Sequence, residues 1–431
     1  MKRYNYNSLS DPERAVLLKR PGGDFSDIVP TVKKVLEDVR RRGDEAVRQY
    51  AREFDGVDLL SFGVLPDEFA VGESAVNEKT KRALRDASSS IRQYHLPQVP
   101  QSHQVQTRLG VLCSLEWQPI NRVGLYVPGG SAPLVSTLLM LVIPALIAGC
   151  KEIVVMTPPR RDGTVSPEIL FAASMLGVSS LFKIGGSQAI AAMAFGTETV
   201  PKVDKIFGPG NRFVAASKAL VAQPPFNVPS DMIAGPTELL IIADDSSNPM
   251  WIASDLLSQA EHGNDSQVVL VTPSSSFANN VERCLQDQLP SLPRSEIAKQ
   301  ALQNSVVILV GNINEAVEFS NLYAPEHLII ATDSASQVKG RITNAGSVFL
   351  GPLTSVVFGD YASGTNHTLP TGGTASATGG VTVGSFMKPI FFQTVSADGL
   401  NSLAETTAVL AEAEGLVGHA NAARMRGIKR D

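Results

Sequence analysis

The chain has 431 residues, of which 43% are hydrophobic and 18% are charged, a balance that excludes an intrinsically disordered protein. The 37 basic and 42 acidic side chains give a net charge of −5, and the basic residues form no block, so no nucleic-acid partner is expected. Three cysteines are too few for a disulfide framework or a Cys-only zinc site, and they fit a reducing compartment.

The N-terminus has no apolar stretch typical of a signal peptide, and the early Asp11 and Glu13 argue against a transit peptide. The most apolar run covers residues 134–148. It is shorter than the roughly 20 residues needed to cross a bilayer, and Pro144 interrupts it. We therefore expect a cytoplasmic protein without a membrane segment, in which this run is a buried helix.

Apolar side chains in the first hundred residues have helical spacing, with predicted helices over 28–42, 44–54 and 73–94. From residue 109 onwards, short β-branched runs alternate with helical patterns, which predicts βαβ units. The predicted strands are 123–127, 153–156, 181–184, 205–207, 239–243, 268–271, 306–310, 328–331 and 348–350. Nine strands exceed one comfortable sheet. We expect an α/β fold with two doubly wound, incomplete Rossmann-like parallel-sheet domains and small helical extensions at both ends.

Gln259 and His262 lie three residues apart at the end of a predicted helix, so both point from one helical face and can share a metal ion. The alternative is that His262 is an ordinary C-terminal helix residue with Gly263 as the cap. Spacing alone favours this alternative.

Glu326 and His327 follow Pro325 and form a candidate acid/base pair. They fit equally well as the end of a helix that leads into a buried strand. Asp360 and His367 lie at the start of a Gly-, Thr- and Ser-rich passage, 359–384, predicted to be an ordered functional loop or a linker. An ordinary surface turn is the alternative.

Glu414 and His419 belong to the C-terminal helical segment, where a solvated helix face is equally compatible with the sequence. Nitrogen and oxygen donors without thiolate suit Zn²⁺, or less well Mn²⁺ or Co²⁺.

Two Gly-rich stretches, 127–131 and 207–211, run from a strand into a helix, where backbone N–H groups can face a phosphate. Neither matches the G-x-G-x-x-G fingerprint, and tight turns explain the glycines equally well.

Eight motifs lie in order along nearly the whole chain: RVGLYVPGGSAP from Arg122, GGSQAI from Gly185, FGTETVPKVDKIFGPGN from Phe195, DMIAGPTE from Asp231, LLSQAEH from Leu256, YAPEHL from Tyr323, GDYASGTNH from Gly359 and EGLVGH from Glu414. Together they closely resemble the histidinol dehydrogenase family. The resemblance implies oxidation of L-histidinol through L-histidinal to L-histidine with two NAD⁺, the last step of histidine biosynthesis.

The resemblance also implies the site residues. One Zn²⁺ per subunit would be bound by Gln259, His262, Asp360 and His419. His327 would take the alcohol proton, and Glu326 would activate a water molecule. The residues implied to contact the substrate are Thr237, Gln259, His262, His327, Asp360, His367, Glu414 and His419, and those implied to contact NAD are Tyr126, Gln188 and Asn211.

A homodimer with shared active sites is implied as well, in which Glu414 and His419 complete the site of the other subunit. The domains expected on this basis are a helical extension over 1–25, a zinc and substrate domain over 26–125 and 236–380, an NAD-binding domain over 126–235, and a C-terminal helical segment over 381–431 that reaches the partner subunit.

Two other functions remain open on the sequence. A related zinc and NAD dehydrogenase acting on another small polyol, such as a sulfonated diol, would keep the Glu326–His327 pair. A non-catalytic metal- or nucleotide-binding protein should have lost one of the acid/base or ligand residues, and all of them are present.

Overall fold

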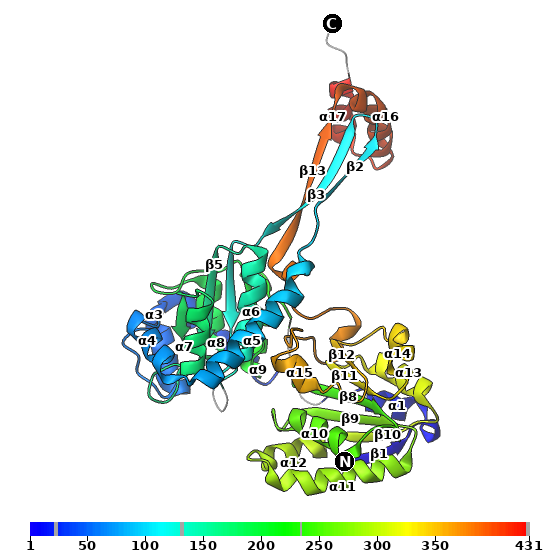
Figure 1. The fold of residues 1–431 in the computed structure, drawn as a ribbon. Helices are drawn as coiled ribbons and strands as arrows, with labels where there is room; N and C mark the ends of the chain where they lie inside the picture. Colours follow the sequence, from blue (N-terminus) through cyan, green and yellow to red (C-terminus); the bar gives the residue numbers. More distant parts are fainter. Residues whose placement is uncertain (21–24, 130–132, 233–234, 428–431) are drawn as a thin grey trace.

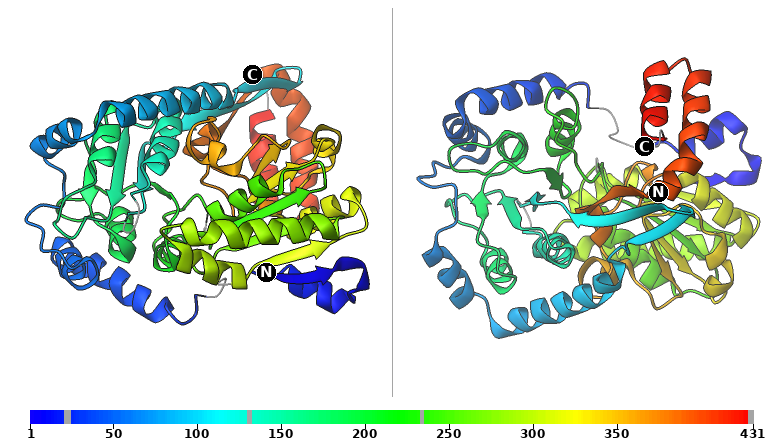
Figure 2. Two further views of the ribbon diagram at one scale, coloured as in Figure 1. Left: turned by 60° about the horizontal axis from the view of Figure 1, so that its bottom comes forward. Right: turned by 90° about the horizontal axis from the view of Figure 1, so that it is seen from above.

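A computed structural model describes residues 1–20, 25–129, 133–232 and 235–427 of the chain. It has two lobes, each built on a parallel sheet, and an arm that projects from them (Figure 1). Figure 2 shows from two further sides that the lobes lie next to each other. All nine predicted strands are present and are divided between the two sheets, which confirms the predicted fold class. None of the helices in the described ranges is both long and apolar enough to cross a membrane.

The four-stranded sheet is parallel and has the strand order β6-β5-β4-β7. Val123 and Leu125 of β4 point to one face, while Gly124 and Tyr126 point to the other, as the two-residue period of a strand requires. The elements of this sheet and the helices between its strands are β4 (Arg122–Tyr126), α6 (Val135–Ala148), β5 (Glu152–Thr157), α7 (Pro167–Met175), β6 (Leu181–Lys183), α8 (Gly186–Phe195), β7 (Lys205–Phe207) and α9 (Arg212–Val221).

Four N-terminal helices also pack on this lobe: α2 (Val29–Arg42), α3 (Asp44–Tyr50), α4 (Pro66–Ala75) and α5 (Glu78–His95). The expectation that residues 26–125 belong to the other domain was therefore wrong. A helical pattern such as that of α2 shows an apolar stripe, but it does not show which partner will cover the stripe.

The six-stranded sheet is also parallel, with the strand order β1-β10-β9-β8-β11-β12. Helices α10, α11, α12 and α15 cover one face, and α1, α13 and α14 cover the other. The bounds are β1 (Lys2–Asn5), α1 (Asp11–Leu17), β8 (Glu238–Ala243), α10 (Pro249–Ala260), β9 (Gln267–Thr272), α11 (Ser275–Gln288), α12 (Ser295–Gln303), β10 (Val306–Leu309), α13 (Ile313–Tyr323), β11 (His327–Ala331), α14 (Ala335–Val338), β12 (Ser347–Leu350) and α15 (Val356–Tyr361).

In the predicted helical extension over 1–25, the first residues form the edge strand β1, and the helices among its described residues are the 3₁₀ turn Tyr6–Ser8 and α1. A short segment beside an open sheet edge gains the main-chain hydrogen bonds that the edge offers. This pairing with β10, some 300 residues away, leaves no local trace in the sequence.

The arm is an antiparallel sheet of β2 (His103–Arg108), β3 (Val111–Pro119) and β13 (Met387–Val395), followed by α16 (Ala397–Ala413) and α17 (Val417–Gly427). The C-terminal segment over 381–431 thus contains the predicted helices and, in addition, a strand that was missed. Both outer strands are largely exposed within one chain, so they lack the alternation of buried and exposed residues that identifies a strand.

Candidate active site

A pocket of about 150 Å³ lies between the two lobes. It is bounded by the carboxyl edge of the four-stranded sheet, whose strand β7 leads into Pro209 and Gly210, and by the amino edge of the six-stranded sheet, where β11 begins at His327. The lining residues are Leu134, Ser136, Thr137, Pro209, Gly210, Gly235, Thr237, Gln259, His262, Glu326, His327, Asp360, Tyr361, His367, Thr368, Leu369 and Thr371.

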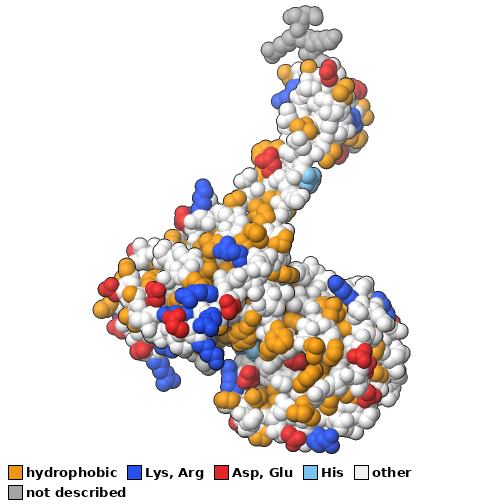
Figure 3. Space-filling model, in the orientation of Figure 1, with side chains coloured by type: hydrophobic (Ala, Val, Ile, Leu, Met, Phe, Trp, Pro, Cys, Tyr) orange, Lys and Arg blue, Asp and Glu red, His pale blue; other side chains and the backbone are white. Residues whose placement is uncertain are grey.

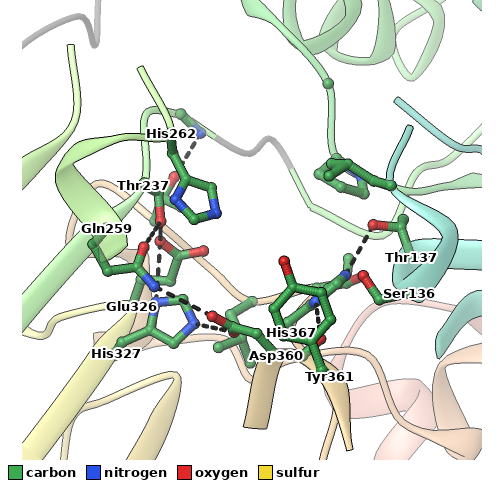
Figure 4. Close-up of a pocket in the computed structure, with 17 residues that line it drawn as sticks. Ser136, Thr137, Thr237, Gln259, His262, Glu326, His327, Asp360, Tyr361 and His367 are labelled. Carbon is green, nitrogen blue, oxygen red and sulfur yellow. Dashed lines mark hydrogen bonds and ion pairs between the residues drawn. The ribbon is translucent and has the colours of Figure 1, made fainter. Parts of the chain in front are cut away.

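His262 lies in the turn after α10, and its ring points into the pocket (Figure 4). Nδ1 is 2.9 Å from the carbonyl oxygen of Ser258, one turn earlier. Because a carbonyl only accepts, Nδ1 carries the proton, and Nε2 keeps a lone pair for a ligand. The bond to Ser258 is also what a helix-end histidine would make, while the direction of the ring places Nε2 at the pocket.

Gln259 lies on the same helix and is buried. Its Nε2 is 3.4 Å from Oδ2 of Asp360. The hydroxyl of Thr237 lies 3.1 Å from Oε1 of Gln259 and 2.6 Å from Oε2 of Glu326. A hydroxyl has one proton, and the carboxylate is both closer and the stronger acceptor. Oε1 of Gln259 is thus left available to a cation.

Asp360 is near the end of the short helix α15, rather than in the loop expected from its sequence. Burial acts to raise the pKa of this carboxyl, but the nearby His327, 3.4 Å away, helped by the charges of His367 and His262, holds it below its ordinary value. Asp360 is therefore a carboxylate at neutral pH.

Within the described ranges, no group of three or more His, Cys, Asp or Glu side chains is arranged to hold a metal ion. The reason is visible in the predicted ligand set. One predicted ligand is the amide of Gln259, and another, His419, lies on α17 of the arm. The pocket of a single chain thus brings together Gln259, His262 and Asp360, but not His419.

Glu326 and His327 lie at the amino end of β11, next to the start of β8. Oε2 of Glu326 accepts hydrogen bonds from the Thr237 hydroxyl, at 2.6 Å, and from the backbone N–H of Glu238, at 2.9 Å. These two donors fix the buried carboxylate in a single position at the pocket wall.

The ring of His327 is held from both sides. Nδ1 lies 3.3 Å from the carbonyl oxygen of Glu238 and 3.5 Å from Oε2 of Glu326. The buried Nε2 makes no hydrogen bond to a described residue, although Oδ1 of Asp360 is 3.4 Å away. Burial lowers the pKa of His327, but the Glu326 and Asp360 carboxylates outweigh it and raise the pKa to about 10. The ring is protonated at neutral pH while both carboxylates act on it.

His367 approaches from the opposite side of the pocket, next to the four-stranded lobe (Figure 4). Its Nδ1 donates to the carbonyl oxygen of Asp360 at 3.0 Å, and its Nε2 lies 2.9 Å from the Thr137 hydroxyl. Burial lowers the pKa of His367, so the ring is neutral, and Nε2 accepts from Thr137. Thr137 was not among the residues predicted for the site. A sequence signal for it was present, because Ser136 and Thr137 are polar residues in an otherwise apolar buried helix.

The predicted cofactor residues lie at the carboxyl edge of the four-stranded sheet. The Tyr126 hydroxyl accepts from the backbone N–H of Gly186 at 3.1 Å, and Nε2 of Gln188 donates to Asp55 at 3.2 Å. Oε1 of Gln188 is buried and makes no hydrogen bond to a described residue. Asn211 caps α9, where its Oδ1 accepts from two backbone N–H groups, at 3.0 and 3.1 Å.

The tight-turn explanation of the second Gly-rich stretch is correct at Gly208. Its φ is +113°, and a Cβ there would lie 2.1 Å from the carbonyl oxygen of Tyr126. The close approach of β4 to this turn therefore requires glycine. In the first stretch, Gly130 and Ser131 lie outside the described residues.

Glu414 and His419 are on the arm, at the end of α16 and in α17, and both side chains are exposed. They do not line the pocket of their own chain. The fold therefore separates these two predicted site residues from the other members of the set.

Comparison with known proteins gives one consistent result. The family model for histidinol dehydrogenase matches residues 18–427. A histidinol dehydrogenase of Bacteroides thetaiotaomicron is 48% identical over 97% of both chains, and one of Xanthomonas euvesicatoria pv. vesicatoria is 47% identical over 99% of both. A crystal structure of histidinol dehydrogenase from Elizabethkingia anophelis superposes with a TM-score of 0.94 at 44% identity, covering 99% of this chain and 98% of that one. These matches give no support to the diol dehydrogenase alternative.

Proposed function

Because the chain belongs to the histidinol dehydrogenase family of oxidoreductases, we propose that it oxidises L-histidinol through L-histidinal to L-histidine with two NAD⁺, as the last step of histidine biosynthesis. One observation carries this proposal: a single pocket joins the side chains of Gln259, His262 and Asp360 to the pair Glu326 and His327. Ligands for a cation and groups that can move protons thus face the same small volume.

The donor set of the pocket suits Zn²⁺. Gln259 offers Oε1, His262 offers Nε2, and Asp360 offers a carboxylate, all of which are donors that zinc accepts. We propose one Zn²⁺ per subunit at these three residues and His419 of a second copy. When bound, Zn²⁺ supplies a positive charge that binds and orients the nitrogen groups of histidinol.

The arm supports a homodimer with shared active sites. It projects away from both lobes and carries apolar side chains that one chain leaves uncovered, among them Phe391 and Leu410, 72% and 62% exposed (Figure 3). Such surfaces favour an interface. In the proposed dimer, Glu414 and His419 of one subunit complete the pocket of the other, and Glu414 contacts the substrate there with Thr237.

The first oxidation uses His327. The alcohol carbon passes a hydride to NAD⁺ while the hydroxyl proton moves to Nε2 of His327, which gives L-histidinal and NADH. This step needs a neutral ring. A carboxylate of Asp360 engaged by a cation no longer acts fully on His327, and the pKa of His327 then falls toward the range of an effective base.

The second oxidation uses Glu326. Its carboxylate would take one proton from a water molecule as the water oxygen adds to the aldehyde carbon, and the hydrate anion that forms would become the acid by losing its hydride to the second NAD⁺. The hydrogen bonds from Thr237 and from the backbone of Glu238 hold Oε2 of Glu326 for this task. His367, held by Thr137, contacts the substrate from the opposite wall.

NAD is proposed to lie along the carboxyl edge of the four-stranded sheet, in contact with Tyr126, Gln188 and Asn211. The helix α8 begins at this edge without a side-chain cap, and its N-terminal N–H groups suit a pyrophosphate. The unpaired Oε1 of Gln188 offers an acceptor to a hydroxyl of the cofactor.

Zinc quantification combined with the yield of NADH per histidinol consumed tests this function. One zinc per chain and two NADH per histidinol are expected. A yield of one NADH would overturn the second oxidation. Rates on L-histidinol and on a sulfonated diol should be compared in the same assay, and turnover of the diol alone would overturn the proposed substrate.

A further inference from the structure

Two residues outside the predicted site join the helices that carry the candidate zinc ligands. The hydroxyl of Ser355 donates a hydrogen bond of 2.5 Å to Oδ1 of Asp255, although the residues are 100 positions apart. Asp255 lies on α10, one turn before Gln259. Ser355 is the N-cap residue of α15, directly before its first helical residue, and Asp360 lies near the end of that helix.

Each helix holds part of the cation site. Helix α10 carries Gln259 and provides the Ser258 carbonyl that orients His262, whereas α15 carries Asp360. The candidate ligands also touch each other, but only through the 3.4 Å contact between Gln259 and Asp360. That contact uses ligand side chains, which must be free to turn toward a cation. The Asp255–Ser355 bond is shorter and uses none of them.

The position of the Asp360 side chain depends on how the first turn of α15 is oriented. Asp360 lies five positions after Ser355, which is about 7.5 Å along a helix axis, so a tilt of about 10° moves Asp360 by more than about 1 Å. Functional sites tolerate errors of about 0.5 Å. Helix α15 has only six residues, of which Val356 and Gly359 are buried, so packing alone restrains it weakly.

Asp255 is not explained by stability. The carboxyl is half-buried, its partial burial raises its pKa to about 6, and none of the ion pairs among the described residues includes Asp255. A carboxylate partly removed from water without a cation beside it costs stability, so its presence next to the site favours a role in the site.

We propose that Asp255 is a positioning residue of the zinc site, which holds Ser355 and thereby fixes the distance of Asp360 from Gln259 and His262. This inference rests on the proposed function of those three residues as zinc ligands. Loss of a residue that orients a metal ligand weakens metal affinity by about 10- to 100-fold in known zinc sites.

The test measures the dissociation constant of Zn²⁺ for the full chain by competition with a chelating indicator. Ser355→Ala and Asp255→Ala are expected to weaken binding about 10-fold or more. Asp255→Asn is expected to stay within about threefold of wild type, because its amide oxygen still accepts from Ser355. The melting temperature of each zinc-free variant is recorded alongside.

Ser274 provides the matched control. Its hydroxyl donates to Asp245 at 2.8 Å, and it caps α11 at the opposite, carboxyl edge of the same sheet. Ser274→Ala should lower the melting temperature while leaving zinc affinity unchanged.

Wild-type zinc affinity in both Ser355→Ala and Asp255→Ala would overturn the inference while leaving the proposed function intact. Binding by Asp255→Asn as weak as that of Asp255→Ala would also overturn it, since charge rather than the hydrogen bond would then matter. If Ser355→Ala does not fold, the Asp255→Asn and Asp255→Ala pair decides. A wild-type chain that takes up no zinc would overturn the proposed function, and this inference with it.

Discussion

Nε2 of His327 lies 3.4 Å from Oδ1 of Asp360, while Nδ1 of the same ring lies 3.5 Å from Oε2 of Glu326. The imidazole is thus placed between the carboxylate proposed to bind zinc and the carboxylate proposed to activate water. The charge of Glu326 is the larger of the two influences that raise the pKa of His327 to about 10, and Asp360 adds to it. If Asp360 binds a cation, as proposed, its action on His327 is weakened, and cation binding is then coupled to proton transfer.

Glu326→Gln is expected to bind zinc and histidinol normally but to turn over about 10²–10⁴-fold more slowly, because an amide cannot take a proton from water. Zinc content, histidinol affinity and steady-state rate should be measured on the same preparation. A rate close to that of wild type would remove Glu326 from the mechanism.

His262→Asn is expected to lower zinc content, because it removes the neutral Nε2 that the Ser258 contact directs into the pocket. Elemental analysis after dialysis measures the change. His103→Asn is the matched control, since this exposed histidine lies on β2 of the arm, and it should retain full zinc occupancy. Full occupancy in His262→Asn would refute the ligand assignment.

A mixed dimer tests whether sites are shared. His262→Asn and His419→Asn should each be nearly inactive alone, because each removes one ligand from every site. After mixing and exchange of subunits, the heterodimer has one intact site, formed by His262 of one chain and His419 of the other. With random pairing, half of the dimers are heterodimers, and each heterodimer has one working site out of two. About one quarter of wild-type activity should therefore return.

The control for this experiment combines both changes in one chain. In an equal mixture of wild type and the His262→Asn/His419→Asn double variant, the heterodimer has no intact site, so exchange should lower the activity from about one half to about one quarter of wild type. Absence of recovery in the first mixture, with subunit exchange verified by a tag, would contradict shared sites.

Tyr126→Phe is expected to raise the KM for NAD⁺ about 2- to 10-fold, the range of one lost hydrogen bond, because the turn at Gly186 loses its acceptor. The KM for histidinol and the zinc content should stay unchanged. An unchanged KM for NAD⁺ would place the cofactor elsewhere.

The stability of the zinc-free chain should depend on pH through Asp255, whose pKa rises from 3.8 to about 6 on folding. The folded state binds this proton more tightly, so the stabilisation is complete below about pH 4 and is lost as the pH rises through about 6. Asp255→Asn should therefore gain stability over wild type with rising pH, by at most about 3 kcal/mol above pH 7. Denaturant unfolding at pH 4.5, 6 and 8 measures the difference, and a constant difference would contradict it.

Much of the fold followed from local patterns. The β-branched runs predicted nine strands, because a buried parallel strand must be apolar along its length, as β8 and β11 are. The arm strands gave no such signal. The side chains of β13 are mostly exposed within one chain, and a second copy, if it covers them, leaves no period in the sequence.

The residue types of the candidate site could be chosen from the sequence, since few histidines and carboxylates lie in polar, Gly-rich or helix-end settings. The sequence could not predict that these residues lie together in one pocket. Gln259 and Asp360 are 101 positions apart and come into contact only because α15 packs on α10. The pairing of Asp255 with Ser355 was missed for the same reason, since these residues are 100 positions apart. Thr137 stood out locally as a polar residue in an apolar helix, but its partner His367 is 230 positions away.

The sequence by itself determined the nine central strands of the two lobes, many of the helices and the chemical groups available, because periodicity and side-chain chemistry are local properties. Only the tertiary structure decided that α2 to α5 cover the four-stranded sheet, that the pocket lies between the amino edge of one sheet and the carboxyl edge of the other, and that His419 is carried away on the arm. Those outcomes depend on which apolar faces pack together, and many pairings of such faces satisfy the same local pattern.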